Sequence, residues 1–346
     1  VVVQGSVRER RRLAGQLLLL WVVLGLRVNW AKGQRGDKVN WIGTSIYIAS
    51  MRAGPAVRCE LTAKKTQEIV KLIDELAAES GMVGAKKVLR LAGMLAWICG
   101  LFPWMRAYNS ALWATITATR DESAGEAHWA AKSRTARKRP SYMVFVKRFR
   151  PALIWVRTLF RQVDKGQQTR LGRWFPLAVR LHEAAYVVRC DASPSGMGAI
   201  LFHKGKPWKY WADIITDEDL AFLKAERKPE WQPEFELLGI VVSLKIWAEL
   251  LELQSVTIHG DALAALYAAE KFSSKSPAMN FIAGALGLLV ETKSIHITCK
   301  HVPESVNLDA DALSRLAEGR ALPRSLLEAE RVPAPIRDES FYMQDR

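Results

Sequence analysis

Cysteine is scarce in this chain, and its few copies lie far apart. The 346 residues contain 4 cysteines, Cys59, Cys99, Cys190 and Cys299. No C-x-x-C pair occurs and no histidine is spaced for zinc, so the pattern favours free thiols over disulfides or metal ligands. Because Cys190 and Cys299 lie in apolar, strand-like runs, we expect them to be buried. A reducing intracellular compartment, cytoplasm or nucleus, fits this usage.

The sequence also lacks an apolar run long enough to cross a membrane. The run LAGQLLLLWVVLGL at 13–26 has 14 residues, whereas a spanning helix needs about 20. Arginines precede it as in a signal peptide, but no small-residue cleavage site follows. We interpret it as a buried helix and expect no membrane partner. A targeting segment or membrane anchor over 8–26 is the alternative, and the initial Val1 is consistent with a fragment.

Acidic residues are scarce in the first half of the chain. The whole sequence carries 50 Lys and Arg against 35 Asp and Glu, a net charge of +15. Residues 1–185 hold 32 basic and 12 acidic side chains, 186–317 hold 13 and 17, and 318–346 hold 5 and 6. A basic arm followed by an acidic module favours a polyanionic partner and a carboxylate metal site. The alternative is a solvated basic surface without a partner.

The first half of the chain is expected to be mainly helical. Apolar residues recur at helical spacing in 61–81, with Gly81 as the C-cap glycine. The sequence Gly-Leu-Phe-Pro at 100–103 divides 86–116 into two helices. The other segments are a strand-like run at 38–50, a polar linker or loop at 121–141, and an aromatic, basic stretch at 142–181.

From residue 186 the pattern changes to short strands and helices. Three strands are expected in hairpin succession, because β-branched and aromatic runs are separated by glycine turns. A polar loop then leads to a strong amphipathic helix. The order βββ-α-β-α-α-β-α predicts an α/β fold with a five-stranded mixed sheet and flanking helices. The strands are expected at 186–193, 197–203, 206–213, 255–261 and 294–302, and the helices at 233–253, 261–271, 276–292 and 307–319.

Four acidic residues fall where these strands end or helices begin. Asp191 ends the first strand, Asp261 ends the fourth, Glu236 lies in the first turn of the long helix, and Asp311 begins the last helix. Such positions can converge at one edge of a sheet, where clustered carboxylates repel unless a hard cation neutralises them. Two Mg²⁺ ions about 3.5–4 Å apart can hydrolyse a phosphodiester. Singly, each acid also has a structural explanation, such as turn capping by Asp191.

The segments around these acids resemble a known family. They look like the four motifs of type 1 ribonuclease H, and more narrowly like the ribonuclease H domain of Gypsy-like and DIRS-like retrotransposon reverse transcriptases. The ending N-x-x-A-D-x-L-S-R is the most specific part. The four segments are CDASPSGMGAIL (190–201), EFELLGIVVSL (234–244), TIHGDALAAL (257–266) and KHVPESVNLDADALSR (300–315).

The resemblance implies roles for particular residues. Asp191, Glu236, Asp261 and Asp311 would be catalytic ligands of two Mg²⁺ ions, with Mn²⁺ as a substitute. His301 matches the family histidine associated with product release or proton transfer. The implied activity is metal-dependent endonucleolytic hydrolysis of the RNA strand of RNA–DNA hybrids, with 5′-phosphate and 3′-hydroxyl products and no small-molecule cofactor.

The match has three departures and one ambiguity. Gly260 stands where the family usually has Thr, Glu304 replaces a usual Gly and adds a negative charge near the site, and Gly239 replaces a common Ala. None of them removes a ligand. Both Asn307 and Asp309 are suitable helix N-caps, and we assign that role to Asp309.

The basic half is similar to the preceding parts of the same polyprotein. Residues 24–48 resemble the end of a reverse-transcriptase palm, and the helices after residue 60 resemble the thumb and connection. No Y-x-D-D motif occurs, so polymerisation by this chain is not expected; the missing polymerase part is a candidate partner. The expected divisions are 1–60 palm remnant, 61–120 helical thumb/connection-like region, 121–185 basic linker or connection, 186–317 ribonuclease H-like domain and 318–346 tail.

Two hypotheses about function follow from the sequence. The first is a ribonuclease H that grips a hybrid through phosphates and sugars with its basic half. The second is a catalytically inactive, nucleic-acid-binding relic. Tryptophans of the basic half can serve either binding or packing, and we assign Trp97, Trp104 and Trp113 to the core.

Overall fold

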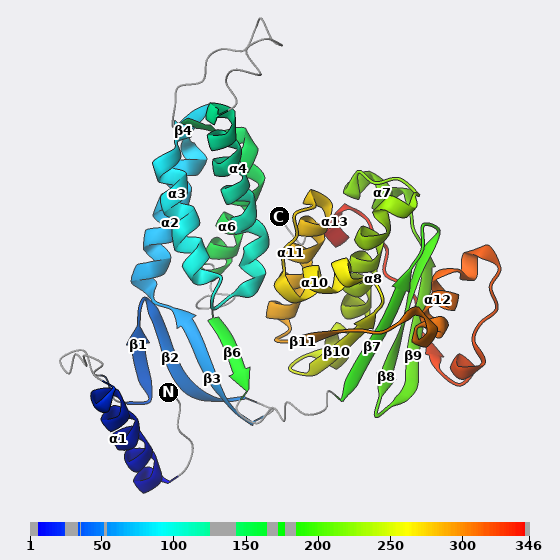
Figure 1. Cartoon of the computed structure of the whole chain (residues 1–346), viewed down its shortest axis with the longest axis horizontal. Helices are drawn as coiled ribbons and strands as arrows, with labels where there is room; N and C mark the ends of the chain where they lie inside the picture. The colour runs from blue at the N-terminus through cyan, green and yellow to red at the C-terminus, as the bar shows by residue number, and fades with distance from the viewer. Residues whose placement is uncertain are drawn as a thin grey trace, which may run out of the picture.

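Figure 1 shows two bodies side by side, one built on each half of the chain. The computed structural model describes residues 6–24, 34, 36–51, 54–124, 143–164, 172–176 and 185–342. The first body is a four-stranded sheet with a helical bundle standing on it. The second is a larger mixed sheet with helices on both faces, so the fold is α/β as predicted.

The first sheet is antiparallel and has the order β1-β2-β3-β6. The run at 38–50 that we expected to be one strand is two strands, because the chain reverses at Ile42 and Gly43, both of which have positive φ. The strands are β1 (Lys38–Trp41), β2 (Thr44–Met51), β3 (Gly54–Leu61) and β6 (Gly172–Pro176).

Four helices form the bundle. The predicted break between two helices at 100–103 is confirmed, and a 3-10 turn, η2 (Pro103–Met105), occupies it. Gly81 has a positive φ, but the helix ends earlier, with Glu79 as its C-cap. The helices are α2 (Ala63–Ala78), α3 (Ala85–Ile98), α4 (Arg106–Ala124) and α6 (Val146–Asp164), and a small ladder joins β4 (Met82–Gly84) to β5 (Met143–Phe145).

Two expectations for the basic half are met only in part. Of the three tryptophans assigned to the core, Trp104 is buried and Trp97 packs against the core, but Trp113 is 39% exposed. The polar segment begins inside α4, which runs to Ala124, so helix replaces the start of the predicted linker. Residues 125–141 of it lie outside the described residues.

The N-terminal apolar run forms α1 (Val7–Val23), but the prediction that it is buried is wrong. Leu19 and Leu20 are 64% and 51% exposed, and Figure 1 shows the helix standing away from the bundle. Leu13 and Val23 of the same helix are exposed as well. No helix among the described residues has both the length and the apolar character that crossing a membrane requires.

The second sheet contains every predicted strand and one more. Its order is β11-β10-β7-β8-β9-β12, with β7, β8 and β9 antiparallel and β10, β11 parallel to β7. The sixth strand comes from the segment that we expected to be a separate tail. The strands are β7 (Tyr186–Ala192), β8 (Gly196–His203), β9 (Lys206–Ile214), β10 (Ser255–Gly260), β11 (His296–His301) and β12 (Glu330–Arg331).

The helices of this body differ from the prediction in three details. The helix expected at 233–253 breaks at Trp247 and is buried on all sides rather than amphipathic, because α11 and the sheet enclose it. Part of the expected polar loop is a helix with a capping box at Thr216. The last helix is shorter than predicted. The helices are α7 (Asp217–Leu223), α8 (Gln232–Ile246), α9 (Ala248–Leu251), α10 (Leu263–Lys271), α11 (Pro277–Thr292) and α12 (Leu308–Ser314).

Beyond β12, the C-terminal segment is tied to the second sheet by a buried ion pair. The Arg337 guanidinium donates to Asp219 at 3.0 Å and to Asp213 at 2.7 Å. Tyr342, in α13 (Glu339–Tyr342), donates to Asp219 as well. A charge buried this way needs its partners, so the segment is an integral part of this body.

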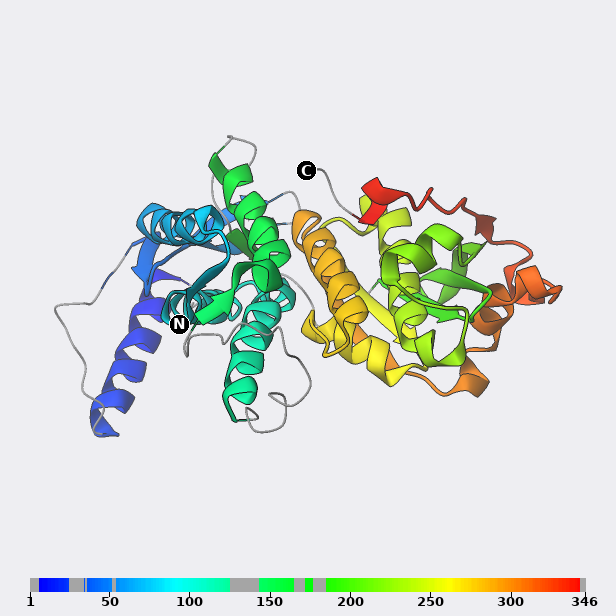
Figure 2. The ribbon, with the colours of Figure 1, turned by 90° about the horizontal axis from the view of Figure 1, so that it is seen from above.

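Helix α11 joins the two bodies, as the view in Figure 2 shows. The Asn280 amide donates to the Ala107 carbonyl at 2.8 Å, and Ser110 donates to Asn280 at 3.2 Å. Gly287 faces η2 so closely that a Cβ there would lie 2.2 Å from the Cβ of Trp104. Only glycine permits this approach of helix to turn.

Candidate active site

Three of the four predicted acids meet at one edge of the second sheet. Asp191 lies at the end of β7, Asp261 directly follows β10, and Glu236 points in from α8. One carboxylate oxygen from each residue lies within 4.8 Å of the other two. The parallel pairing of β7 and β10 brings their ends to the same edge, which explains why residues 70 positions apart meet.

Glu236 is held by hydrogen bonds to a single oxygen. The Ala192 N–H donates to its Oε1 at 3.2 Å, and the Gln232 amide donates to the same atom at 3.0 Å. Gln232 lies one helical turn before Glu236 and also donates to the Ala192 carbonyl. Burial, with Asp191 and Asp261 nearby, raises the pKa of Glu236 well above its usual range.

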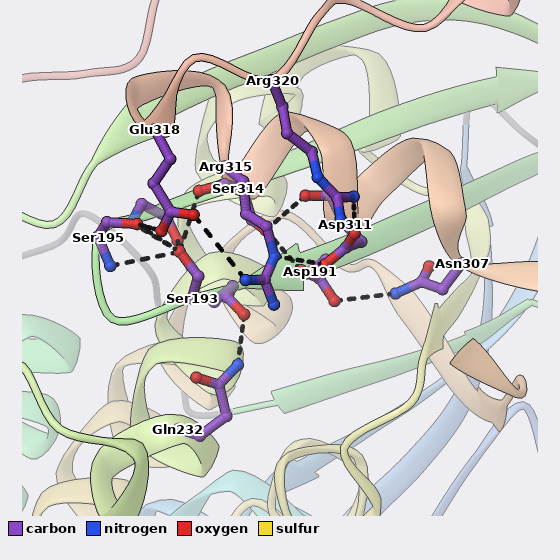
Figure 3. A network of polar contacts seen from close by, with 12 residues as sticks. Asp191, Ser193, Ser195, Gln232, Asn307, Asp311, Ser314, Arg315, Glu318 and Arg320 are labelled. Atoms are coloured by element: carbon purple, nitrogen blue, oxygen red, sulfur yellow. Dashed lines mark hydrogen bonds and ion pairs between the residues drawn. The ribbon is translucent and has the colours of Figure 1, made fainter. Parts of the chain in front are cut away.

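Asp191 is gripped from α12, the helix on the other face of the sheet. Ser314 donates to its Oδ2 at 2.6 Å, and the Asn307 amide donates to its Oδ1 at 3.2 Å (Figure 3). Its side chain is buried, and this desolvation is the main reason that its pKa is raised to about 7. The repulsion from Asp261 and Asp311 acts in the same direction.

Asp311 lies in the same pocket but outside the group of three. It accepts hydrogen bonds from Arg315 Nε at 2.7 Å and from Arg320, so two guanidinium groups neutralise it (Figure 3). His301, at the end of β11, is exposed on the pocket rim. The pocket has a volume of about 480 Å³, and all five predicted residues line it.

The site suits a divalent cation. Carboxylate oxygens are the ligands that hard cations prefer. Three carboxylates this close repel one another unless a bound cation neutralises their charge. The pocket that the three carboxylates line is also lined by Asp311 and Glu304, which adds to its negative charge. The residues present therefore fit a metal of the Mg²⁺ or Mn²⁺ type better than a soft metal.

The three departures from the family pattern leave the site geometry intact. A Cβ on Gly260 would meet nothing nearer than 3.6 Å, and one on Gly239 nothing nearer than 3.8 Å, so glycine is tolerated rather than required at both positions. Glu304 does line the pocket, as its place in the sequence predicted. Its charge adds to the negative potential there.

Sequence reasoning missed the residues that orient the acids. Gln232, Asn307 and Ser314 hold Glu236 and Asp191, and two of the three belong to the N-x-x-A-D-x-L-S-R segment, which was a usable signal. The N-cap assignment was wrong. Asn307, not Asp309, is the N-cap of α12, and Asp309 instead accepts a hydrogen bond from Ser325.

All four cysteines lie among the described residues and are free, as predicted. Cys59, Cys99 and Cys190 are buried, and Cys299 is half-buried. Burial and the neighbouring carboxylates raise the pKa of the Cys190 thiol well above its usual range, which disfavours the thiolate form.

Part of the second body matches a known protein family in sequence. Residues 182–283 match the sequence profile of the RNase H-like domain found in reverse transcriptase. Among solved structures, RNase H1 from Halobacterium salinarum NRC-1 is 17% identical, with a TM-score of 0.31. The match covers 39% of this chain and 98% of the RNase H1 chain.

The match to a foamy viral enzyme extends over more of the chain. The foamy viral protease-reverse transcriptase in complex with RNA/DNA hybrid is 16% identical, with a TM-score of 0.33. The match covers 97% of this chain and 36% of the length of the foamy viral chain. The match to the same enzyme in complex with dsDNA covers 87% of this chain and 52% of the length of the foamy viral chain. A search of curated proteins gave no match.

Proposed function

We propose that the second body is a ribonuclease H, a metal-dependent endonuclease that hydrolyses the RNA strand of RNA–DNA hybrids. The observation that carries the proposal is the meeting of Asp191, Glu236 and Asp261 within 4.8 Å. These acids lie in the segment that matches the RNase H-like profile. Asp191 and Glu236 are buried, and the repulsion among the three carboxylates is unfavourable until a cation neutralises it.

Each acid has a role in this proposal. Asp191, Glu236 and Asp261 would hold one cation, and Asp311 would help to hold a second, with Mg²⁺ as the resident metal and Mn²⁺ as a substitute. Such cations, when bound, activate water and stabilise the leaving oxygen of the phosphodiester. Ser314, Asn307 and Gln232 keep the carboxylates oriented toward the pocket.

His301 and the basic half complete the proposal. His301 stands on the rim of the pocket, where an imidazole can exchange a proton with departing product. The excess of Lys and Arg in residues 1–185 supplies contacts to the phosphates of a hybrid. Since no Y-x-D-D motif occurs, we assign no polymerase activity to this chain; a polymerase part supplied by another polypeptide is a proposed partner.

The test is cleavage of a hybrid labelled on both strands by the full chain. With Mg²⁺ present, we expect cuts in the RNA strand alone, leaving 5′-phosphate and 3′-hydroxyl ends, and none in EDTA. RNA duplex and DNA duplex of the same sequence serve as matched substrates. Cleavage that persists in EDTA, or that is equal on all three substrates, would contradict the proposal.

A second candidate is a relic that binds nucleic acid without cutting it. One observation favours it: Asp311 is paired with two arginines instead of joining the other acids. Tight, salt-dependent binding of hybrid without metal-dependent cleavage would select this alternative.

A further inference from the structure

The Asp311 carboxylate is paired with positively charged side chains of the chain itself. Its side chain is only 13% exposed, and its two oxygens face different guanidinium groups, Oδ1 that of Arg315 and Oδ2 that of Arg320 (Figure 3). Arg315 is on the next turn from Asp311. Arg320 is nine residues away and reaches Asp311 only because the chain folds back.

The fold-back is built by a specific turn. After α12, the 3-10 turn η5 (Leu316–Glu318) ends at Gly319, which has a φ of +88°. The Gly319 N–H donates to the Leu316 carbonyl at 3.1 Å, and the Arg320 N–H donates to the Arg315 carbonyl at 3.4 Å. This is the helix-terminating pattern that glycine favours, and it aims Arg320 back over α12.

A second contact holds the turn against the sheet. The Glu318 carboxylate accepts a hydrogen bond from the Ser195 hydroxyl, in the loop that follows Asp191 (Figure 3). Arg320 is nevertheless 51% exposed, and among the described residues its guanidinium pairs with Asp311 alone. The turn is therefore held by backbone hydrogen bonds and by Glu318, whereas the Arg320 side chain is half exposed to solvent.

We propose that Arg320 is a positioning residue that competes with the second cation for Asp311. The inference rests on the metal site of the proposed function. The group of Asp191, Glu236 and Asp261 is open to a first cation, whereas a second cation that needs Asp311 must displace a guanidinium. The two cations should therefore bind with unequal affinity, and the ion pair of Arg320 with Asp311 contributes to the difference.

Calorimetric titration of the full chain with Mn²⁺, without nucleic acid, tests this directly. Replacing Arg320→Gln removes the competitor, so the affinity for the second ion should rise about fivefold, the value of an ion pair worth about 1 kcal/mol. The affinity for the first ion should stay within about twofold of the wild-type value. Arg324→Gln is the matched control, because Arg324 is an exposed arginine of the same segment.

Gly319→Ala provides an independent variant that keeps every charge. It strains the turn and loosens Arg320, so it should also raise the affinity for the second ion. Melting curves in EDTA check that both variants fold. Unchanged affinity in Arg320→Gln, or an equal rise in Arg324→Gln, would overturn the inference while leaving the proposed function standing. No ion bound by the wild type would overturn both.

Discussion

Glu236 is, with Asp191, one of two acids of the site whose charged form the fold disfavours. Its carboxylate is buried, both of its described hydrogen bonds go to Oε1, and the neighbouring carboxylates of Asp191 and Asp261 repel it. The raised pKa follows from this environment: the folded protein disfavours the charged form. Stability is therefore lost as the pH rises above the pKa of Glu236 in the unfolded chain.

Replacing Glu236→Gln should stabilise the metal-free protein. Glutamine keeps the oxygen that accepts from Ala192 and Gln232 and removes the charge, so the free energy of unfolding at pH 8 should rise by about 1–2 kcal/mol. Urea unfolding in EDTA measures this. Glu230→Gln, an exposed acid in the turn before α8, should change little. A loss of stability in Glu236→Gln would show that the charge is not the source of strain.

At the scale of elements, α11 decides how the two bodies are joined. Gly287 lets this helix touch η2, and Asn280 adds hydrogen bonds at the same surface. Because a Cβ at Gly287 would overlap both the Cα and the Cβ of Trp104, the backbone itself must move to accept one.

Gly287→Ala should lower the free energy of unfolding by about 1–3 kcal/mol through overpacking. Gly93→Ala is the control, since a Cβ at that exposed position of α3 meets nothing within 4 Å. There the same substitution should stabilise by up to about 1 kcal/mol, because alanine favours a helix. Thermal melting compares the two, and equal shifts would contradict the close packing of α11 on η2.

The elements also show what the sequence can and cannot predict. The five long strands followed from alternating and β-branched runs. The four candidate acids followed from their places at strand ends and helix starts, and the resemblance gave them their roles. The strand β12 has two residues, Glu330 and Arg331, too few for any periodic signal, and it forms only by pairing with β9, more than 100 residues earlier in the chain. The exposure of α1 could not be predicted either, because burial depends on what surrounds a helix and not on its own pattern.

At the scale of the whole molecule, the contact between the two bodies contains a titratable acid. Glu291, near the end of α11, faces Arg58 and Arg173 of the first sheet. Burial outweighs both arginines and raises its pKa from about 4.5 to about 7. When the pKa of a carboxyl group is higher in the folded than in the unfolded chain, ionisation of that group lowers the free energy of unfolding.

Stability should therefore fall as the pH rises from about 5 to about 8, and Glu291→Gln should remove part of that fall. The expected gain over the wild type at pH 8 is about 2 kcal/mol, with little difference at pH 5. Urea unfolding at the two pH values measures it, with the exposed Glu328→Gln as control. The same gain at both pH values would exclude Glu291 ionisation as the cause.

The account as a whole depends on the three meeting carboxylates forming a cation site that cuts RNA. The most direct measurement is the rate of RNA-strand cleavage in an RNA–DNA hybrid by the wild type, Glu236→Gln and Glu230→Gln, each with Mg²⁺ and with EDTA. We predict metal-dependent cleavage by the wild type and by Glu230→Gln, and a rate at least about 10³-fold lower in Glu236→Gln. Equal cleavage by Glu236→Gln and the wild type would contradict the account.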